Sequence, residues 1–218
     1  MVTSRTEYMQ SIKGVLLKVG KILLQVLKIL LIIYLAFFSF LAVHEWMGHI
    51  LADELVDTRH GTTLARIEVI VHWFSVNLQD GRWSVELVPF RIGGKVVSAV
   101  PGDPFTMTDW ELGFGNFMGS GITALVSLVT LVVLNLRKDL WRFPWFAVFF
   151  SLFSVIFDQI FETFVNPTVA LDSAVLMGAD PLLFKIIIVG LVLLQGWLMV
   201  PIGIRYRRGR HARPMVNE

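Results

Sequence analysis

Four long runs of apolar residues alternate with shorter polar stretches along this chain. They cover residues 29–50, 117–136, 144–165 and 182–204. A helix needs about 20 consecutive apolar residues to cross the hydrocarbon core of a bilayer, and only helices and closed barrels satisfy their backbone hydrogen bonds there. The strand-like alternation that a barrel requires does not recur over enough segments. The pattern therefore predicts an all-α, multi-pass integral membrane protein with four transmembrane helices.

The segment between the first and second apolar runs has a different pattern. Residues 66–74 and 83–90 are rich in Val, Ile, Trp and Phe, and Asp80-Gly81 between them is a typical hairpin turn. Glycine and proline pairs farther along separate additional short stretches of the same kind. We therefore expect a small β-sheet insertion of two to four strands, at about residues 60–105, between helices 1 and 2.

Composition agrees with a membrane environment. Hydrophobic residues make up 55% of the chain and charged residues 17%, and the mean hydropathy is +0.68, whereas about a quarter of the residues of a soluble domain are charged. We expect one membrane domain, residues 29–204, with membrane lipid as its main partner. The absence of cysteine excludes disulfides, iron–sulfur clusters and thiolate zinc sites, so any metal must bind to His, Asp or Glu.

Basic residues cluster in three places: the amphipathic N-terminal segment 1–28, the short loop at residues 137–142, and the C-terminal tail 205–218. In a four-helix protein these three segments lie on the same side of the membrane. The positive-inside rule makes that side cytoplasmic, so both termini are predicted to be cytoplasmic. The basic tail is typical of a stop-transfer flank, and we expect no nucleic-acid partner.

The first apolar run ends in ionisable residues, which are costly in a spanning segment and so indicate function. They are His44, Glu45 and His49. In the usual H-E-x-x-H motif the two histidines lie on one helix face and bind zinc, with the glutamate as general base. Here the spacing is i, i+5, which separates the side chains by roughly 140° on a regular helix. A π-bulge would realign them, and Gly48 makes that deformation easier. The alternative is a polar helix end in which Glu45 pairs with one histidine.

Three further motifs follow in order. They are Pro89 and Gly93-Gly94 in VELVPFRIGGKVV, Gly119-Ser120 in helix 2, and Asn166-Pro167 followed by Asp172 in NPTVALDSAVLMG. Together with the first motif, this series resembles the site-2 protease family of intramembrane zinc metalloproteases. One residue is inserted in the first motif, Ser replaces Pro in the third, and Ser replaces the Gly after the aspartate in the fourth.

The resemblance implies the fold, the cofactor and the site of such a protease. The cofactor is Zn²⁺, and the substrate is a membrane protein or peptide. The implied ligands are His44, His49 and Asp172, the implied general base is Glu45, and Asn166 is implied to hold the substrate or an oxyanion. An exposed strand of the insertion can pair with the extended substrate.

Two alternatives stay open. Asp158 and Glu162 lie one turn apart on helix 3, as a polar stripe facing the bundle or as alternative ligands to Asp172. The departures from the family's motifs also fit a catalytically inactive relative that serves as a membrane binding or assembly factor. Because His44, Glu45, His49 and Asp172 are all present, the enzyme is the favoured interpretation.

Overall fold

The computed structural model describes residues 3–61, 66–79, 82–91, 93–100, 107–137 and 144–211. The chain divides into two compact units, Met1–Leu35 and Ala36–Glu218. The first unit holds most of helix α1, and the second holds the remaining elements. In chain order the elements are α1 (Thr3–Ala42), the π-helix η1 (Val43–Ile50), α2 (Leu51–Arg59), β1 (Arg66–Val71), β2 (Phe74–Gln79), β3 (Arg82–Leu87), β4 (Gly94–Val100), α3 (Asp109–Leu136), α4 (Pro144–Phe153), the π-helix η3 (Ser154–Val165), α5 (Ala170–Leu176) and α6 (Pro181–His211).

Four helical segments of the described chain are long and apolar enough to cross a membrane. They are Lys13–Arg59, Asp109–Leu136, Pro144–Val165 and Pro181–Arg205. The predicted fold class, with four apolar helices and a small sheet between the first two, is thereby confirmed. The boundaries differ at both ends of the chain. The N-terminal segment and the first apolar run form one continuous helix, and the last helix extends to His211.

Local sequence signals explain several helix ends. Thr108 caps α3: its side chain accepts a hydrogen bond from the backbone N–H of Glu111, and the Glu111 carboxylate accepts one from the backbone N–H of Thr108. Proline begins both α4 and α6, where its missing N–H has no helical partner. The π-helix η3 ends before Asn166, because the residue preceding Pro167 disfavours helical geometry.

The insertion is a four-stranded antiparallel sheet with the strand order β3-β2-β1-β4. The predicted strand at residues 66–74 is too long. The chain turns at His72, whose φ of 52° is left-handed, and the second strand begins at Phe74. The predicted Asp80-Gly81 turn lies outside the described residues, but the strands on either side of it pair as a hairpin does.

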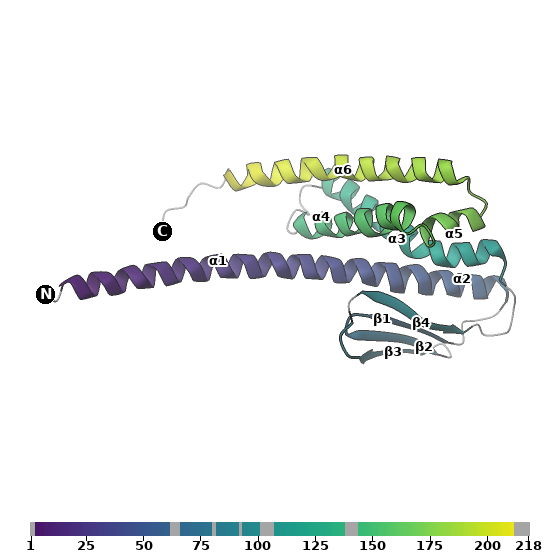
Figure 1. Ribbon diagram of the computed structural model, residues 1–218, viewed down its shortest axis with the longest axis horizontal. Coiled ribbons are helices and arrows are strands. Elements are labelled where there is room, and N and C mark those ends of the chain that lie inside the picture. Colours follow the sequence, from purple (N-terminus) through teal and green to yellow (C-terminus); the bar gives the residue numbers. More distant parts are fainter. Residues whose placement is uncertain are drawn as a thin grey trace. The chain divides into compact units, whose positions relative to one another are not determined.

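The second unit is organised around two contacts of η1. On one side η1 packs on the sheet, where Ile50, Val69 and Leu78 form a buried cluster with Trp46 against it. On the other side it packs on α3, which also contacts α4, η3, α5 and α6. Figure 1 shows α2, the continuation of η1, between the sheet and these helices. The histidine motif therefore lies at the junction of the sheet and the helical bundle.

Candidate metal centre

The histidine motif adopts a π-helix from Val43 to Ile50. Backbone hydrogen bonds in a π-helix join residues five apart, so residues at i and i+5 lie on one face. The rings of His44 and His49 accordingly lie close together, with centroids 5.2 Å apart. The local deformation predicted from the extra residue is confirmed, and it brings the two imidazoles together.

Two glycines let η1 approach α3 closely. A Cβ atom built on Gly48 would lie 2.8 Å from the backbone nitrogen of Gly119 and 2.8 Å from the carbonyl oxygen of Met118. Backbone atoms cannot move aside as a flexible side chain can, so a larger residue does not fit at position 48. The small-residue pattern on α3 thus permits close helix packing, as such patterns do in membranes, and it brings Gly119 up to the histidines.

Each imidazole is held by a hydrogen bond at Nδ1. The Nδ1 of His49 lies 3.0 Å from the carbonyl oxygen of Gly115. Because a carbonyl can only accept, this Nδ1–H must donate. The Nδ1 of His44 lies 3.1 Å from the Oδ1 atom of Asp158, an acceptor when ionised. The bond to Gly115 fixes the tautomer of a neutral His49 in which Nε2 carries a lone pair, and an ionised Asp158 would do the same for His44.

The two Nε2 atoms point toward the same small space above Gly119. A Cβ atom on Gly119 would lie 2.6 Å from Nε2 of His44 and 2.7 Å from Nε2 of His49. These distances are too short for a carbon atom and leave room for something smaller between two nitrogen lone pairs. Two neutral imidazoles that converge in this way are the arrangement in which histidines bind a transition metal.

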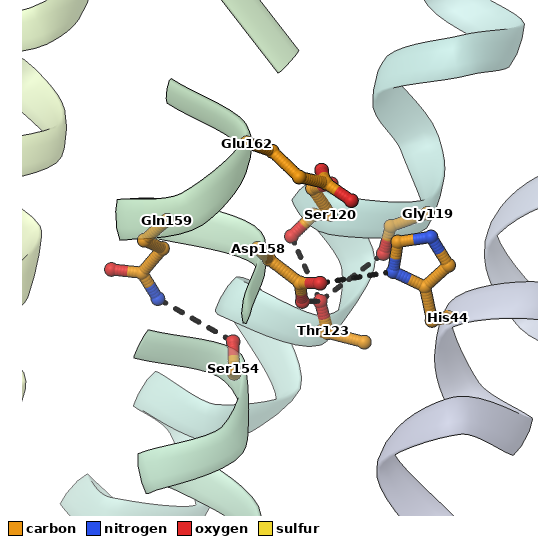
Figure 2. A network of polar contacts seen from close by, with 8 residues as sticks. All are labelled: His44, Gly119, Ser120, Thr123, Ser154, Asp158, Gln159 and Glu162. Carbon is orange, nitrogen blue, oxygen red and sulfur yellow. Dashed lines mark hydrogen bonds and ion pairs between the residues drawn. The ribbon is translucent and has the colours of Figure 1, made fainter. Parts of the chain in front are cut away.

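Two carboxylates from η3 lie beside His44 (Figure 2). Asp158 shares a hydrogen bond with His44 and accepts one from the hydroxyl of Thr123, and Glu162 accepts one from the hydroxyl of Ser120. His44, Asp158 and Glu162 each offer one ligand atom, and these atoms lie within 4.8 Å of one another. Asp158 is 2% exposed and His44 9%, and Glu162 is half-buried. The described residues therefore include a His/Asp/Glu group that can hold a metal ion, and the predicted ligand His49 is not part of that group.

Glu45 lies at a cavity of about 380 Å³. Both Glu45 and His49 line this cavity, together with Gly115 and Asn116 of α3 and Lys95 of β4. The first residue of β4 lies directly against the carboxylate: a Cβ atom on Gly94 would be 2.7 Å from Oε1 of Glu45. The acid predicted as general base therefore lies between a cavity and the start of an edge strand.

The other predicted site residues lie elsewhere. Asp172 is exposed on α5 and is outside the His44 group that can hold a metal. Asn166 is exposed and accepts a hydrogen bond of 2.9 Å from the hydroxyl of Thr168. Neither lines the cavity at Glu45. Their roles as ligand and as substrate or oxyanion contact stay predictions from the resemblance.

Asp158 and Glu162, for which the sequence left open a polar stripe or alternative ligands, lie with His44 in the group that can hold a metal. The signal that pointed to them is the presence of two acids in an apolar span. Gly119 and Ser120 were singled out in the sequence only as a motif of the resemblance, and Thr123 was not singled out, because small residues in a membrane helix usually serve close packing.

No protein-family model, curated protein or solved structure matches this chain. The function is therefore inferred from the geometry of the site.

Proposed function

We propose that this chain is an intramembrane zinc metalloprotease, which hydrolyses peptide bonds of membrane-associated substrates. The observation that carries the proposal is the convergence of the His44 and His49 Nε2 atoms above Gly119, next to a cavity that Glu45 also lines. A hydrolytic zinc site needs protein ligands, an open position for water and a base within reach of that water. In support of the proposal, the described residues include imidazole and carboxylate donors and an acid that lines a cavity.

The donor atoms are of the kinds that zinc prefers. His44 and His49 would bind it through Nε2, and Glu162, which belongs with His44 to the group that can hold a metal, would supply the carboxylate from η3. Asp158 acts through His44, because a carboxylate on the far nitrogen of a metal-binding imidazole fixes its orientation and raises its basicity. Nitrogen and oxygen ligands without thiolates are typical of hydrolytic zinc sites. When bound, zinc lowers the pKa of a coordinated water to about 7 and polarises the substrate carbonyl.

Glu45 is the general base in this proposal. Glu45 is 8% exposed and lines the cavity, so its carboxylate could accept a proton from a water molecule held there and pass it to the leaving amine. General acid–base catalysis of this kind contributes typically 10²–10⁴-fold to the rate.

The strand β4 suggests how the substrate is presented. In the described sheet β4 is an edge strand, and edge strands offer unpaired backbone groups to an extended peptide. Gly94, where β4 begins, lies against Glu45. A substrate that pairs with β4 in extended form would pass beside the base. Helical segments hide their peptide groups, so this proposal requires the substrate to be unwound locally.

The test compares the purified wild-type protein with Glu45→Gln in detergent, using zinc and fluorescently labelled casein as a model substrate. Glutamine keeps the shape of the side chain but cannot accept a proton, so zinc should stay bound while cleavage falls by about 10²–10⁴-fold. Glu86→Gln is the matched control, because Glu86 is exposed on β3, and it should cleave at the wild-type rate.

Equal cleavage by Glu45→Gln and wild type would refute the assignment of the base. Stoichiometric zinc without cleavage of casein or of membrane-protein substrates would favour a non-catalytic binding or assembly factor instead.

A further inference from the structure

One face of the sheet is apolar across three strands. On β3, Trp83, Val85 and Leu87 alternate with the polar residues Arg82, Ser84 and Glu86. The register pairs Trp83 with Leu78, Val85 with Val76, and Leu87 with Phe74. Directly paired residues of antiparallel strands place their side chains on the same face. The apolar row of β3 therefore continues the face that packs under η1.

Burial of this face stops between β2 and β3. Leu78 is 6% and Val76 8% exposed, whereas Trp83 is 59%, Val85 65% and Leu87 79% exposed. The reason is the position of the helix: η1 contacts β1 and β4, and β3 is the outermost strand on the other edge of the sheet (Figure 1). Three large apolar side chains thus project beyond the area that η1 covers.

The sheet that carries these exposed side chains packs against a helix that is apolar enough to span a membrane. The helix that covers the sheet belongs to the candidate span Lys13–Arg59. Its own outward residues Met47, Leu51 and Leu55 are 44–49% exposed and apolar, as expected where lipid is the solvent. A sheet packed against this helix has lipid beside it, and lipid removes the cost of leaving the β3 row in water.

We propose that the β3 row, defined as Trp83, Val85 and Leu87, inserts into the bilayer and anchors the sheet to the membrane surface. The partner is the phospholipid leaflet itself. The backbone of β3 limits how deeply the row can insert, because the unpaired N–H and C=O groups of an edge strand cannot lie in hydrocarbon. The row must therefore lie at the boundary of headgroups and acyl chains, where Trp is favoured. The inference is independent of the proposed protease activity.

The absence of native cysteine makes the test direct. Single-cysteine variants Val85→Cys and Leu87→Cys, with Ser84→Cys and Glu86→Cys as matched controls on the other face of the same strand, are labelled with a nitroxide. The full-length protein is placed in vesicles of phosphatidylcholine and phosphatidylglycerol. Electron paramagnetic resonance then compares relaxation by oxygen, which concentrates in lipid, with relaxation by a water-soluble nickel chelate.

We expect the ratio of oxygen to nickel accessibility to alternate along β3, several-fold higher at positions 85 and 87 than at 84 and 86. Nickel accessibility that is equally high at all four positions would place the row in water and overturn the proposal. Spin–spin broadening at 85 and 87 would identify a second copy of the chain as the partner and would overturn it as well. Because these side chains are exposed, the substitutions leave the core of the sheet intact.

Discussion

Replacing Gly119, which has no side chain to bind a metal, tests whether a metal lies between the two histidines. Gly119→Ala adds one methyl group at the point where the two Nε2 atoms converge. The methyl carbon would lie 2.6 Å from Nε2 of His44 and 2.7 Å from Nε2 of His49. If that space holds the metal, the substitution should prevent metal binding without removing any ligand.

The magnitude follows from these distances. Ordinary van der Waals contact begins at 3.4 Å, so the Nε2 atom of His44 must retreat by about 0.8 Å and that of His49 by about 0.7 Å. Zinc–nitrogen distances of 2.0–2.1 Å tolerate deviations of only about 0.2 Å. Substitutions that merely disturb the orientation of a ligand already weaken metal binding by about 10–100-fold. We therefore expect Gly119→Ala to lower zinc affinity by on the order of 100-fold or more.

The assay is competition for zinc against a chromophoric chelator, with the purified protein in detergent. Gly190→Ala on α6 is the matched control. A Cβ atom at Gly190 would have no heavy atom within 4 Å, and both variants gain the same helix propensity. Wild-type zinc affinity in Gly119→Ala would refute the placement of the metal. An equal loss in Gly190→Ala would show that the effect is not local to the histidines.

Three further predictions follow from the same structure. Asp158→Ala should weaken zinc binding by about 10–100-fold, and Asp158→Asn should bind zinc more tightly than Asp158→Ala because its amide oxygen can accept the imidazole N–H. Asp172→Ala should keep the wild-type zinc affinity. Loss of zinc in the Asp172 variant alone would reverse this assignment. Gly48→Ala should destabilise the protein by about 1–3 kcal/mol through overpacking against the backbone of α3, which thermal unfolding in detergent measures, and an unchanged transition would contradict the close contact. A reporter fused after Glu218 should lie in the cytoplasm, and a reporter inserted within residues 75–82 should lie on the other side of the membrane. The opposite result would invert the predicted topology.

The four apolar helices and the sheet were predictable because their signals are local. Each span is a run of apolar residues long enough for a bilayer, and capping residues and prolines mark several of the ends. The turn at His72 was not predictable. A non-glycine residue with positive φ is uncommon, and neighbouring apolar residues gave residues 66–74 the pattern of one strand.

The motif on η1 was also predictable, including its deformation, because an i, i+5 spacing can place both histidines on one face only if the helix widens. The acidic partner was harder to predict. Asp158 on η3 and Asp172 on α5 come from elements far from His44 in sequence, and the packing of these two elements decides which acid faces the histidines. One sequence does not reveal those packing contacts. The resemblance pointed to Asp172, whereas the geometry favours Asp158 and Glu162.

X-ray absorption at the zinc edge of the purified, zinc-loaded protein identifies the ligands of the metal. We expect one zinc per chain with two imidazole nitrogens at about 2.0–2.1 Å, the remaining ligands oxygen at about 2.0–2.2 Å, and no sulfur. We also expect the imidazole signal to disappear when His44 and His49 are both replaced by alanine. A zinc ion without imidazole ligands, or an unchanged spectrum in the double variant, would contradict the metal centre proposed at this helix junction.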